Sequence, residues 1–230
     1  MLSGQAGSTL FEVDAAGNLK QYNGSITDTY VRIPEVVDYN GTGVIVTGIE
    51  RSAFNGNTYV TDIIIPTTVT WIDVQAFAGC TALQHIDLPN GISVISTGAF
   101  EGCTSLKGVS WSDSVSIIQD RAFYGCTALE TLGNSSQMLT QIGDYAFFDC
   151  SSLRAVTWSS NLNTIGKYSF YNCSSLQALS LPLSVQVVND YAFANCTGIK
   201  EIEFPGANLQ RINTGAFKNC ASLKEILIPD

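Results

Sequence analysis

The chain has 230 residues, of which 20 are acidic and 11 are basic, and its formal net charge is −9. This acidic balance argues against a nucleic-acid-binding protein, because recognition of phosphates needs a basic face. No apolar run approaches the roughly 18 residues that a membrane-spanning helix requires, so we expect no insertion into a bilayer.

Residues 1–43 lack the repeat that fills the rest of the chain. We expect the first ten residues to be a flexible leader. From Phe11 to Tyr22 apolar and polar residues alternate around an A-A-G-N turn, a pattern typical of a β-hairpin. Since a terminal repeat needs a cover for its apolar interior, we interpret this hairpin as an N-terminal cap.

From residue 44 onward a phenylalanine recurs every 23 or 24 residues, and alanine precedes it in every copy except one, where Ser169 precedes Phe170. The eight phenylalanines are Phe54, Phe77, Phe100, Phe123, Phe147, Phe170, Phe193 and Phe217. A period of about 20–29 residues predicts a solenoid, in which each turn buries its apolar side only against its neighbours. We therefore assign residues 44–230 to one solenoid domain of about eight repeats.

Aligned on this phenylalanine, the repeats share the pattern C-x-x-L-x-x-I-x-L-P-x-x-V-x-x-I-x-x-x-A-F-x-x-C. The L-x-x-I-x-L stretch, which ends at a proline in several copies, predicts one short strand per turn and hence a parallel sheet. The V-x-x-I stretch is interpreted as a second extended segment. The segment around Ala-Phe is too short for a full helix, so we expect a single helical or 3-10 turn on the opposite side.

One column predicts a backbone conformation. The residue before the cysteine position is glycine, asparagine or aspartate in all eight copies. These residues are Gly56, Gly79, Gly102, Gly125, Asp149, Asn172, Asn195 and Asn219. Because these three residue types tolerate positive φ, we expect a left-handed turn there in every repeat.

This repeat unit resembles the BspA-type leucine-rich repeat, which is found in surface and secreted proteins of bacteria and some protists. The resemblance covers roughly residues 44 to 230 and rests on eight columns that recur in eight copies. It implies an α/β solenoid coiled in the right-handed sense and, more loosely, a role in adhesion or host interaction. It carries no catalytic residues, and kinship of fold is a weak guide to any particular ligand.

The chain stops at Ile228-Pro229-Asp230, directly after a predicted strand. The C-terminal end of the solenoid is therefore expected to be uncapped, with an unpaired strand edge. We interpret this as a sign that the chain is a fragment of a longer protein.

Seven cysteines occupy one position of seven consecutive repeats, namely Cys80, Cys103, Cys126, Cys150, Cys173, Cys196 and Cys220. Equivalent atoms of stacked strands lie roughly 4.8 Å apart, whereas the Cβ atoms of a disulfide lie about 3.8 Å apart. We therefore expect buried free thiols rather than disulfides. A linear file of sulfurs without any C-x-x-C pair also argues against zinc.

The sequence offers little for catalysis. His85 is the only histidine, and with Asp87 it forms a pair that lacks a nucleophile or a metal partner. No G-x-S-x-G, P-loop or H-E-x-x-H pattern occurs. We expect no enzymatic activity, no cofactor and no metal ion.

The columns that flank Ala-Phe hold a candidate binding surface. In four successive turns they contain six aromatic rings with an arginine at the margin, whereas other turns have small or polar residues there. The candidates are Arg121, Tyr124, Tyr145, Phe148, Tyr168, Tyr171 and Tyr191. Clustered rings are typical of binding hot spots. The alternative is that the rings only stack on each other and stiffen this side.

The outward positions of the predicted strands form a second surface. Its middle is small and nearly uncharged, and Glu201, Glu203 and Glu225 make one end acidic. These glutamates are either a site for a cation or a basic partner, or simply a solvated face.

Three functions fit the sequence. The preferred one is a non-catalytic module of a secreted or cell-surface protein that binds a host protein or a glycan, with signal peptide and anchor outside this chain. The second is a rigid spacer without a ligand. The third is an intracellular interaction scaffold, for which reduced thiols would be natural.

Overall fold

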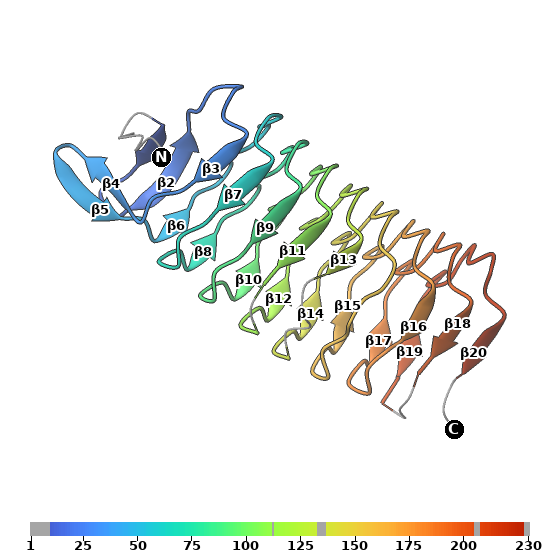
Figure 1. The fold of residues 1–230 in the computed structure, drawn as a ribbon. Helices are drawn as coiled ribbons and strands as arrows, with labels where there is room; N and C mark the ends of the chain where they lie inside the picture. Colours follow the sequence, from blue (N-terminus) through green and yellow to red (C-terminus); the bar gives the residue numbers. More distant parts are fainter. Residues whose placement is uncertain (1–9, 112, 133–136, 205–207, 228–230) are drawn as a thin grey trace.

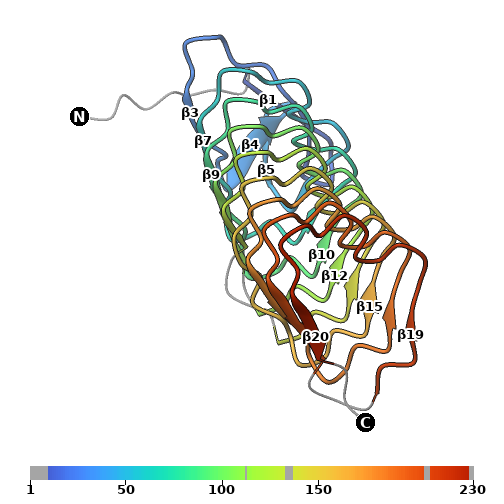
Figure 2. The same ribbon diagram turned by 90° about the vertical axis from the view of Figure 1, so that its right-hand side faces the viewer.

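The computed structural model describes residues 10–111, 113–132, 137–204 and 208–227, in which the chain winds into an elongated solenoid (Figure 1). Turned by 90°, the successive turns are nested one behind another around a common interior (Figure 2). Short strands of consecutive turns pair in parallel along the solenoid. Of the first ten residues, expected to form a leader, residues 1–9 lie outside the described part of the chain.

The strand predicted from L-x-x-I-x-L is present and forms two parallel sheets, the first of which also includes a strand that lies before the repeats and was not predicted. The five-stranded sheet contains β3 (Tyr30–Arg32), β7 (Asp62–Ile64), β9 (His85–Asp87), β11 (Gly108–Ser110) and β13 (Thr131–Leu132). The three-stranded sheet contains β16 (Ala178–Ser180), β18 (Glu201–Glu203) and β20 (Glu225–Leu227). Between the two sheets, Ala155 keeps only an isolated parallel bridge to Thr131.

The alternation of side chains along these strands sets the core. Ile86 is 2% exposed, whereas its neighbours His85 and Asp87 face solvent. This follows from the pleat, which sends successive side chains to opposite faces. In the last turn the pattern weakens, since Ile226 is 40% exposed and Leu227 41%.

The expectation of one strand per turn needs correction, because the V-x-x-I segment also forms a strand. Its six-stranded parallel sheet contains β10 (Val94–Ile95), β12 (Ile117–Ile118), β14 (Gln141–Ile142), β15 (Thr164–Ile165), β17 (Val187–Val188) and β19 (Arg211–Ile212). Equivalent residues pair across turns, as Ile95 does with Ile118. The repeat therefore stacks in strict register on both sides.

The helical or 3-10 turn expected at Ala-Phe is wrong, because the described part of the chain contains no helix. Tight turns take its place. The amide of Asn55 bonds to the carbonyl of Ser52, three residues back, but the amide of Phe54 donates to the carbonyl of Ala76 in the next turn. Every second amide of this segment donates to a carbonyl of the next turn. It therefore cannot donate to a carbonyl of its own turn, as a helix would require.

The left-handed turn expected before each cysteine is confirmed. All eight residues of that column have φ between 60° and 74°. Glycine, asparagine and aspartate thus occur there because the backbone requires positive φ.

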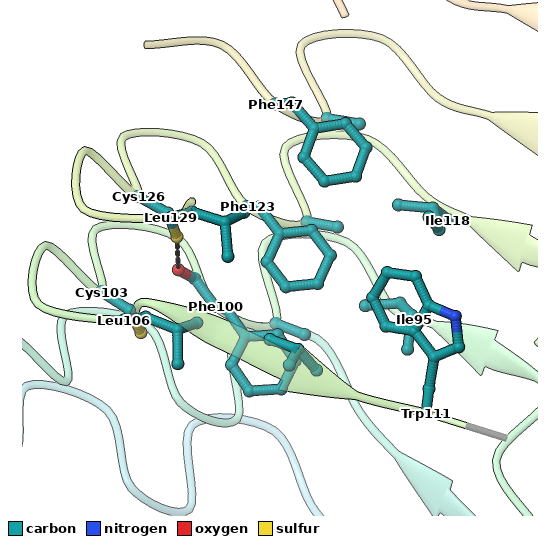
Figure 3. Close-up of a cluster of buried hydrophobic side chains, with 14 of the residues drawn as sticks. Ile95, Phe100, Cys103, Leu106, Trp111, Ile118, Phe123, Cys126, Leu129 and Phe147 are labelled. Carbon is teal, nitrogen blue, oxygen red and sulfur yellow. Dashed lines mark hydrogen bonds between the residues drawn. The ribbon is translucent and has the colours of Figure 1, made fainter. Parts of the chain in front are cut away.

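The repeated phenylalanines form one stack through the interior, with neighbouring ring centroids 5.0–5.6 Å apart. Figure 3 shows three of these rings, Phe100, Phe123 and Phe147, beside Leu106 and Leu129. Each turn therefore buries its ring only against its two neighbours, as the solenoid principle requires.

The seven cysteines are free and buried, as expected. Each Sγ donates a hydrogen bond of 3.0–3.2 Å to the carbonyl oxygen of the phenylalanine one turn earlier. Figure 3 shows this bond between Cys126 and Phe100. The cysteine position thus combines a small apolar side chain with a donor that satisfies a buried carbonyl.

The N-terminal hairpin joins the solenoid rather than merely covering it. Its four-stranded sheet contains β1 (Phe11–Val13), β2 (Asn18–Tyr22), β6 (Gly48–Ile49) and β8 (Trp71–Ile72). β1 and β2 are antiparallel, and β2 then pairs in parallel with β6. The ring of Tyr22 stacks on Phe54 at 5.1 Å and so extends the phenylalanine stack by one ring.

A second hairpin was not foreseen. β4 (Val36–Tyr39) and β5 (Thr42–Ile45) form their own antiparallel sheet at the N-terminal end of the solenoid (Figure 1). Asn40 and Gly41 connect them with φ of 52° and 83°, which suits the tight turn of a two-residue hairpin.

Candidate functional site

The turn side of the solenoid brings the candidate residues together. We call the six rings the aromatic ladder and divide it into two columns. The first column is the residue that precedes the alanine position in each of the eight repeats, and its ladder rings are Tyr145, Tyr168 and Tyr191. The second column is the residue that follows the repeated phenylalanine in each repeat, and its ladder rings are Tyr124, Phe148 and Tyr171. All six residues are half-buried.

The rings of each column stack face to face. Tyr168 lies 5.0 Å from both Tyr145 and Tyr191, with planes within 10°. Phe148 lies 4.9 Å from Tyr124 and 4.7 Å from Tyr171, with planes within 5°. Neighbouring rings therefore cover each other's faces, and the ladder presents its ring edges and hydroxyl groups.

The two columns also touch each other. Tilted contacts join Tyr145 to Phe148 at 5.8 Å and Tyr168 to Tyr171 at 5.7 Å. The column alignment thus identified neighbouring residues correctly, although tight turns rather than a helix place them on one face.

Both ends of the aromatic ladder carry a cation. The Arg121 guanidinium carbon lies 4.2 Å from the Tyr124 ring centroid, and the same group is ion-paired with Glu101. The hydrogen bond to Glu101 raises the pKa of Arg121. At the other end Lys218 Nζ lies 5.8 Å from the Tyr191 ring centroid. Sequence reasoning did not assign a role to Glu101 or Lys218, although both belong to the second column.

The first column has a backbone property that the sequence analysis missed. All eight of its residues have φ between 53° and 62°. They are Ser52, Gln75, Gly98, Arg121, Tyr145, Tyr168, Tyr191 and Gly215. Positive φ is uncommon for a bulky residue. The two glycines were the only signal of this conformation in the sequence.

Aspartates border the first column, because Asp120, Asp144 and Asp190 each directly precede one of its residues. The backbone amide of Asp144 donates to Oδ1 of Asp120 at 2.8 Å, and the amide of Lys167 donates to Oδ1 of Asp144 at 2.7 Å. The Lys167 ammonium lies 3.7 Å from Asp190. Bonds between turns therefore fix the border of the ladder.

Loss of solvation is the main cause that raises the pKa of Tyr168, followed by its neighbours Tyr145 and Tyr191 and by Asp190. Asp190 and the neighbouring tyrosines therefore disfavour the charged form of Tyr168.

The strand side offers a different surface. A shallow hollow of about 390 Å³ lies over Gly108, with the exposed His85 and Asp87 on one side and Glu130 on another. The His85 side chain makes no hydrogen bond to Asp87 or to any other described residue, so the pair lacks the geometry of a catalytic dyad. At the acidic end, β18 and β20 place Glu201 directly beside Glu225.

Two further features concern the described ranges. No three histidine, cysteine, aspartate or glutamate residues there come close enough to share a metal ion. No helix in the same ranges is long and apolar enough to cross a bilayer.

Comparisons with known proteins agree with this architecture. A family model described as the BspA type leucine rich repeat region matches residues 47–138 and 133–230 in 6 copies. A leucine-rich repeat protein of T. pallidum has a TM-score of 0.68 and 24% identity over 90% of this chain and 83% of its own. One from Eubacterium ventriosum has a TM-score of 0.63 and 24% identity over 91% of this chain and 47% of its own. A search of curated proteins found no match.

Proposed function

The chain belongs to the BspA-type leucine-rich repeat family, and we propose that it is a non-catalytic binding module of a secreted or surface-displayed protein. Its partner, a protein or a glycan, binds at the aromatic ladder. The surface location is what membership of this family implies. A solenoid suits this role, because its stacked turns hold an extended surface in a fixed arrangement.

The presence of tyrosine at three successive left-handed positions, Tyr145, Tyr168 and Tyr191, carries this proposal. Left-handed backbone costs an L-residue roughly 1–2 kcal/mol. Gly98 and Gly215 occupy the same column, so the fold accepts a residue without that cost. The repeat imposes this conformation on all eight residues of the column, and only these three turns fill it with tyrosine. Three aromatic rings gathered on one face, where smaller residues are accepted, favour a role in recognition.

A rigid spacer is the second candidate, and the ring stacking favours it. Each stacked pair contributes about 0.5–1.5 kcal/mol, which offsets much of the backbone cost. For a spacer, the ladder would stiffen the turn side and bind nothing.

A fourfold variant separates the two functions. Tyr145 and Tyr168 are replaced by glutamine, which Gln75 shows to be accepted in the first column. Phe148 and Tyr171 are replaced by asparagine, as at Asn55 in the second column. Wild type and variant are tested against purified extracellular-matrix proteins and a glycan array. We expect a partner of the wild type to bind the variant at least about tenfold more weakly, because hot-spot rings dominate affinity.

A strand-side variant, His85→Asn with Asp87→Asn, serves as the control and should bind like wild type. Thermal unfolding of all three proteins completes the test. Absence of any partner for the wild type, together with a lower Tm of the fourfold variant, would favour the spacer instead. Unchanged binding by the fourfold variant would mean that the partner binds elsewhere and that the ladder only stiffens the turn side. Cell fractionation with an antibody to this chain tests the location, and recovery in the cytosol would support the scaffold reading.

A further inference from the structure

We propose that the partner segment that occupies the aromatic ladder is cationic, namely an arginine- or lysine-containing stretch of a protein rather than a glycan. This inference rests on the proposed binding function of the ladder. It follows from three features of the surface: covered ring faces, cations already in contact with the rings, and carboxylates fixed along the border.

The covered faces argue against a saccharide. A sugar ring stacks on the open face of an aromatic side chain, but Phe148 and Tyr168 each have a ring on both faces, at 4.7–5.0 Å. At the ends, Arg121 covers Tyr124 and Lys218 lies over Tyr191. The ladder therefore offers edges, along which an extended side chain can lie.

The contact made by Arg121 indicates which chemistry this surface accepts. Its guanidinium group stacks on Tyr124 and is simultaneously paired with the carboxylate of Glu101. Arginine suits such a site because a planar cation packs on a ring and donates to a carboxylate at once. An arginine of the partner would pair with a border carboxylate in the same way, while its methylene stem would lie along the ring edges.

The border carboxylates are fixed in position and can pair with an arginine of the partner. Oδ1 of Asp120 and Oδ1 of Asp144 each accept a backbone amide of the following turn. Their second oxygens have no hydrogen-bond partner among the described residues, so they can accept from a guanidinium. Ring edges pack against the methylene stem of the same side chain. The net charge of −9 further attracts a basic segment.

A matched pair of variants tests the inference. Asp120→Asn with Asp144→Asn removes two charges from the ladder border, and the asparagine oxygen still accepts the backbone amide. Glu201→Gln with Glu203→Gln removes the same charge from the strand side. The probe is a fluorescein-labelled arginine-serine peptide, with glutamate-serine and glycine-serine peptides for comparison. Binding is followed by fluorescence anisotropy at about 0.15 M salt.

We expect only the arginine-serine peptide to bind. The Asp120/Asp144 variant should bind it about tenfold more weakly, and the Glu201/Glu203 variant like wild type. Equal weakening in both variants would mean general attraction to an acidic chain and would overturn the inference. Failure of the arginine-serine peptide to bind wild type would overturn it as well.

The fourfold ladder variant separates this inference from the proposed function. If that variant loses an extracellular partner that the Asp120/Asp144 variant keeps, the ladder binds but its partner is not cationic there. If both variants keep every partner of the wild type, the proposed binding at the aromatic ladder and this inference are both wrong.

Discussion

At the scale of a single residue, Ser169 is the one member of the alanine column that carries a hydroxyl group. Its side chain is fully buried, and Oγ has no hydrogen-bond partner in the part of the chain that the structure describes. An unpaired buried polar group costs about 1–3 kcal/mol. We therefore expect Ser169→Ala to raise the free energy of unfolding by about 1 kcal/mol in urea denaturation.

The reciprocal change is its control. Ala146 occupies the same position one turn earlier and is also fully buried. Ala146→Ser should lower the free energy of unfolding by a similar amount, because it buries a hydroxyl in an equivalent apolar site. A less stable Ser169→Ala variant would contradict the account.

Gly102 isolates the contribution of backbone conformation. Its φ is 73°, and an added Cβ would come no closer than 3.8 Å to Gly79, so a side chain has room. Asn172 has φ of 61° at the equivalent position. Gly102→Asn should therefore unfold at nearly the wild-type urea midpoint, whereas Gly102→Val should lose about 1–2 kcal/mol. Equal losses for both variants would point to packing rather than to φ.

At the scale of the element, the Ala-Phe turn is where sequence reasoning failed. The apolar columns, the strand and the left-handed residue before cysteine were predictable, because each leaves a residue preference in every copy. The helix was not excluded, because the bond from the Phe54 amide to Ala76 joins two turns and leaves no mark within one repeat. Hydrogen bonds between repeats therefore cannot be predicted from the residue preferences within one repeat.

The candidate site was likewise predictable from the sequence only in part. The spacing of three residues within one turn made the contact of Tyr145 with Phe148 predictable, and the register between turns placed Tyr145 beside Tyr168. The left-handed first column was not, because tyrosine, arginine and glutamine have no preference for positive φ. The Arg121–Glu101 pair also escaped prediction, since it depends on side-chain rotamers rather than on column spacing.

Loss of the packing of the N-terminal hairpin should destabilise mainly the turns next to it. Tyr22 is 8% exposed and covers the first repeat by stacking on Phe54. In a solenoid each turn contacts only its neighbours, so removal of this ring weakens the adjacent turns first. We expect Tyr22→Ala to lower amide hydrogen-exchange protection in residues 46–77 and to leave residues 185–204 unchanged.

Tyr22→Phe is the control, because it keeps the stacked ring and removes only the hydroxyl group. This variant should retain wild-type protection in both ranges. A uniform loss of protection along the chain in Tyr22→Ala would mean that the solenoid unfolds as one cooperative unit.

At the scale of the whole molecule, the column of seven buried cysteines links the free energy of unfolding to pH. Burial raises the pKa of Cys220 to about 12 and raises the pKa values of Cys103, Cys126, Cys150 and Cys173. An ordinary thiol has a pKa of about 8.5. Between these values the unfolded chain loses protons that the folded chain keeps, so alkali favours unfolding. The stabilisation is complete below about pH 8.5 and declines as the pH rises toward 12.

We therefore expect the free energy of unfolding to be level near neutral pH and to fall above pH 9, by up to about 1.4 kcal/mol per pH unit for each such thiol. Urea denaturation at a series of pH values measures this slope. Tyrosine and lysine also titrate in alkali, so the informative quantity is the difference from Cys150→Ala. The Cys150→Ala variant is less stable at neutral pH because the substitution leaves a cavity. Above pH 9 its free energy of unfolding should fall less steeply than that of the wild type, by up to about 1.4 kcal/mol per pH unit, which is the contribution of one thiol. Identical slopes for the two proteins would show that the buried thiols do not govern alkaline unfolding, and would leave Tyr168, whose pKa is also raised, as the group to test next.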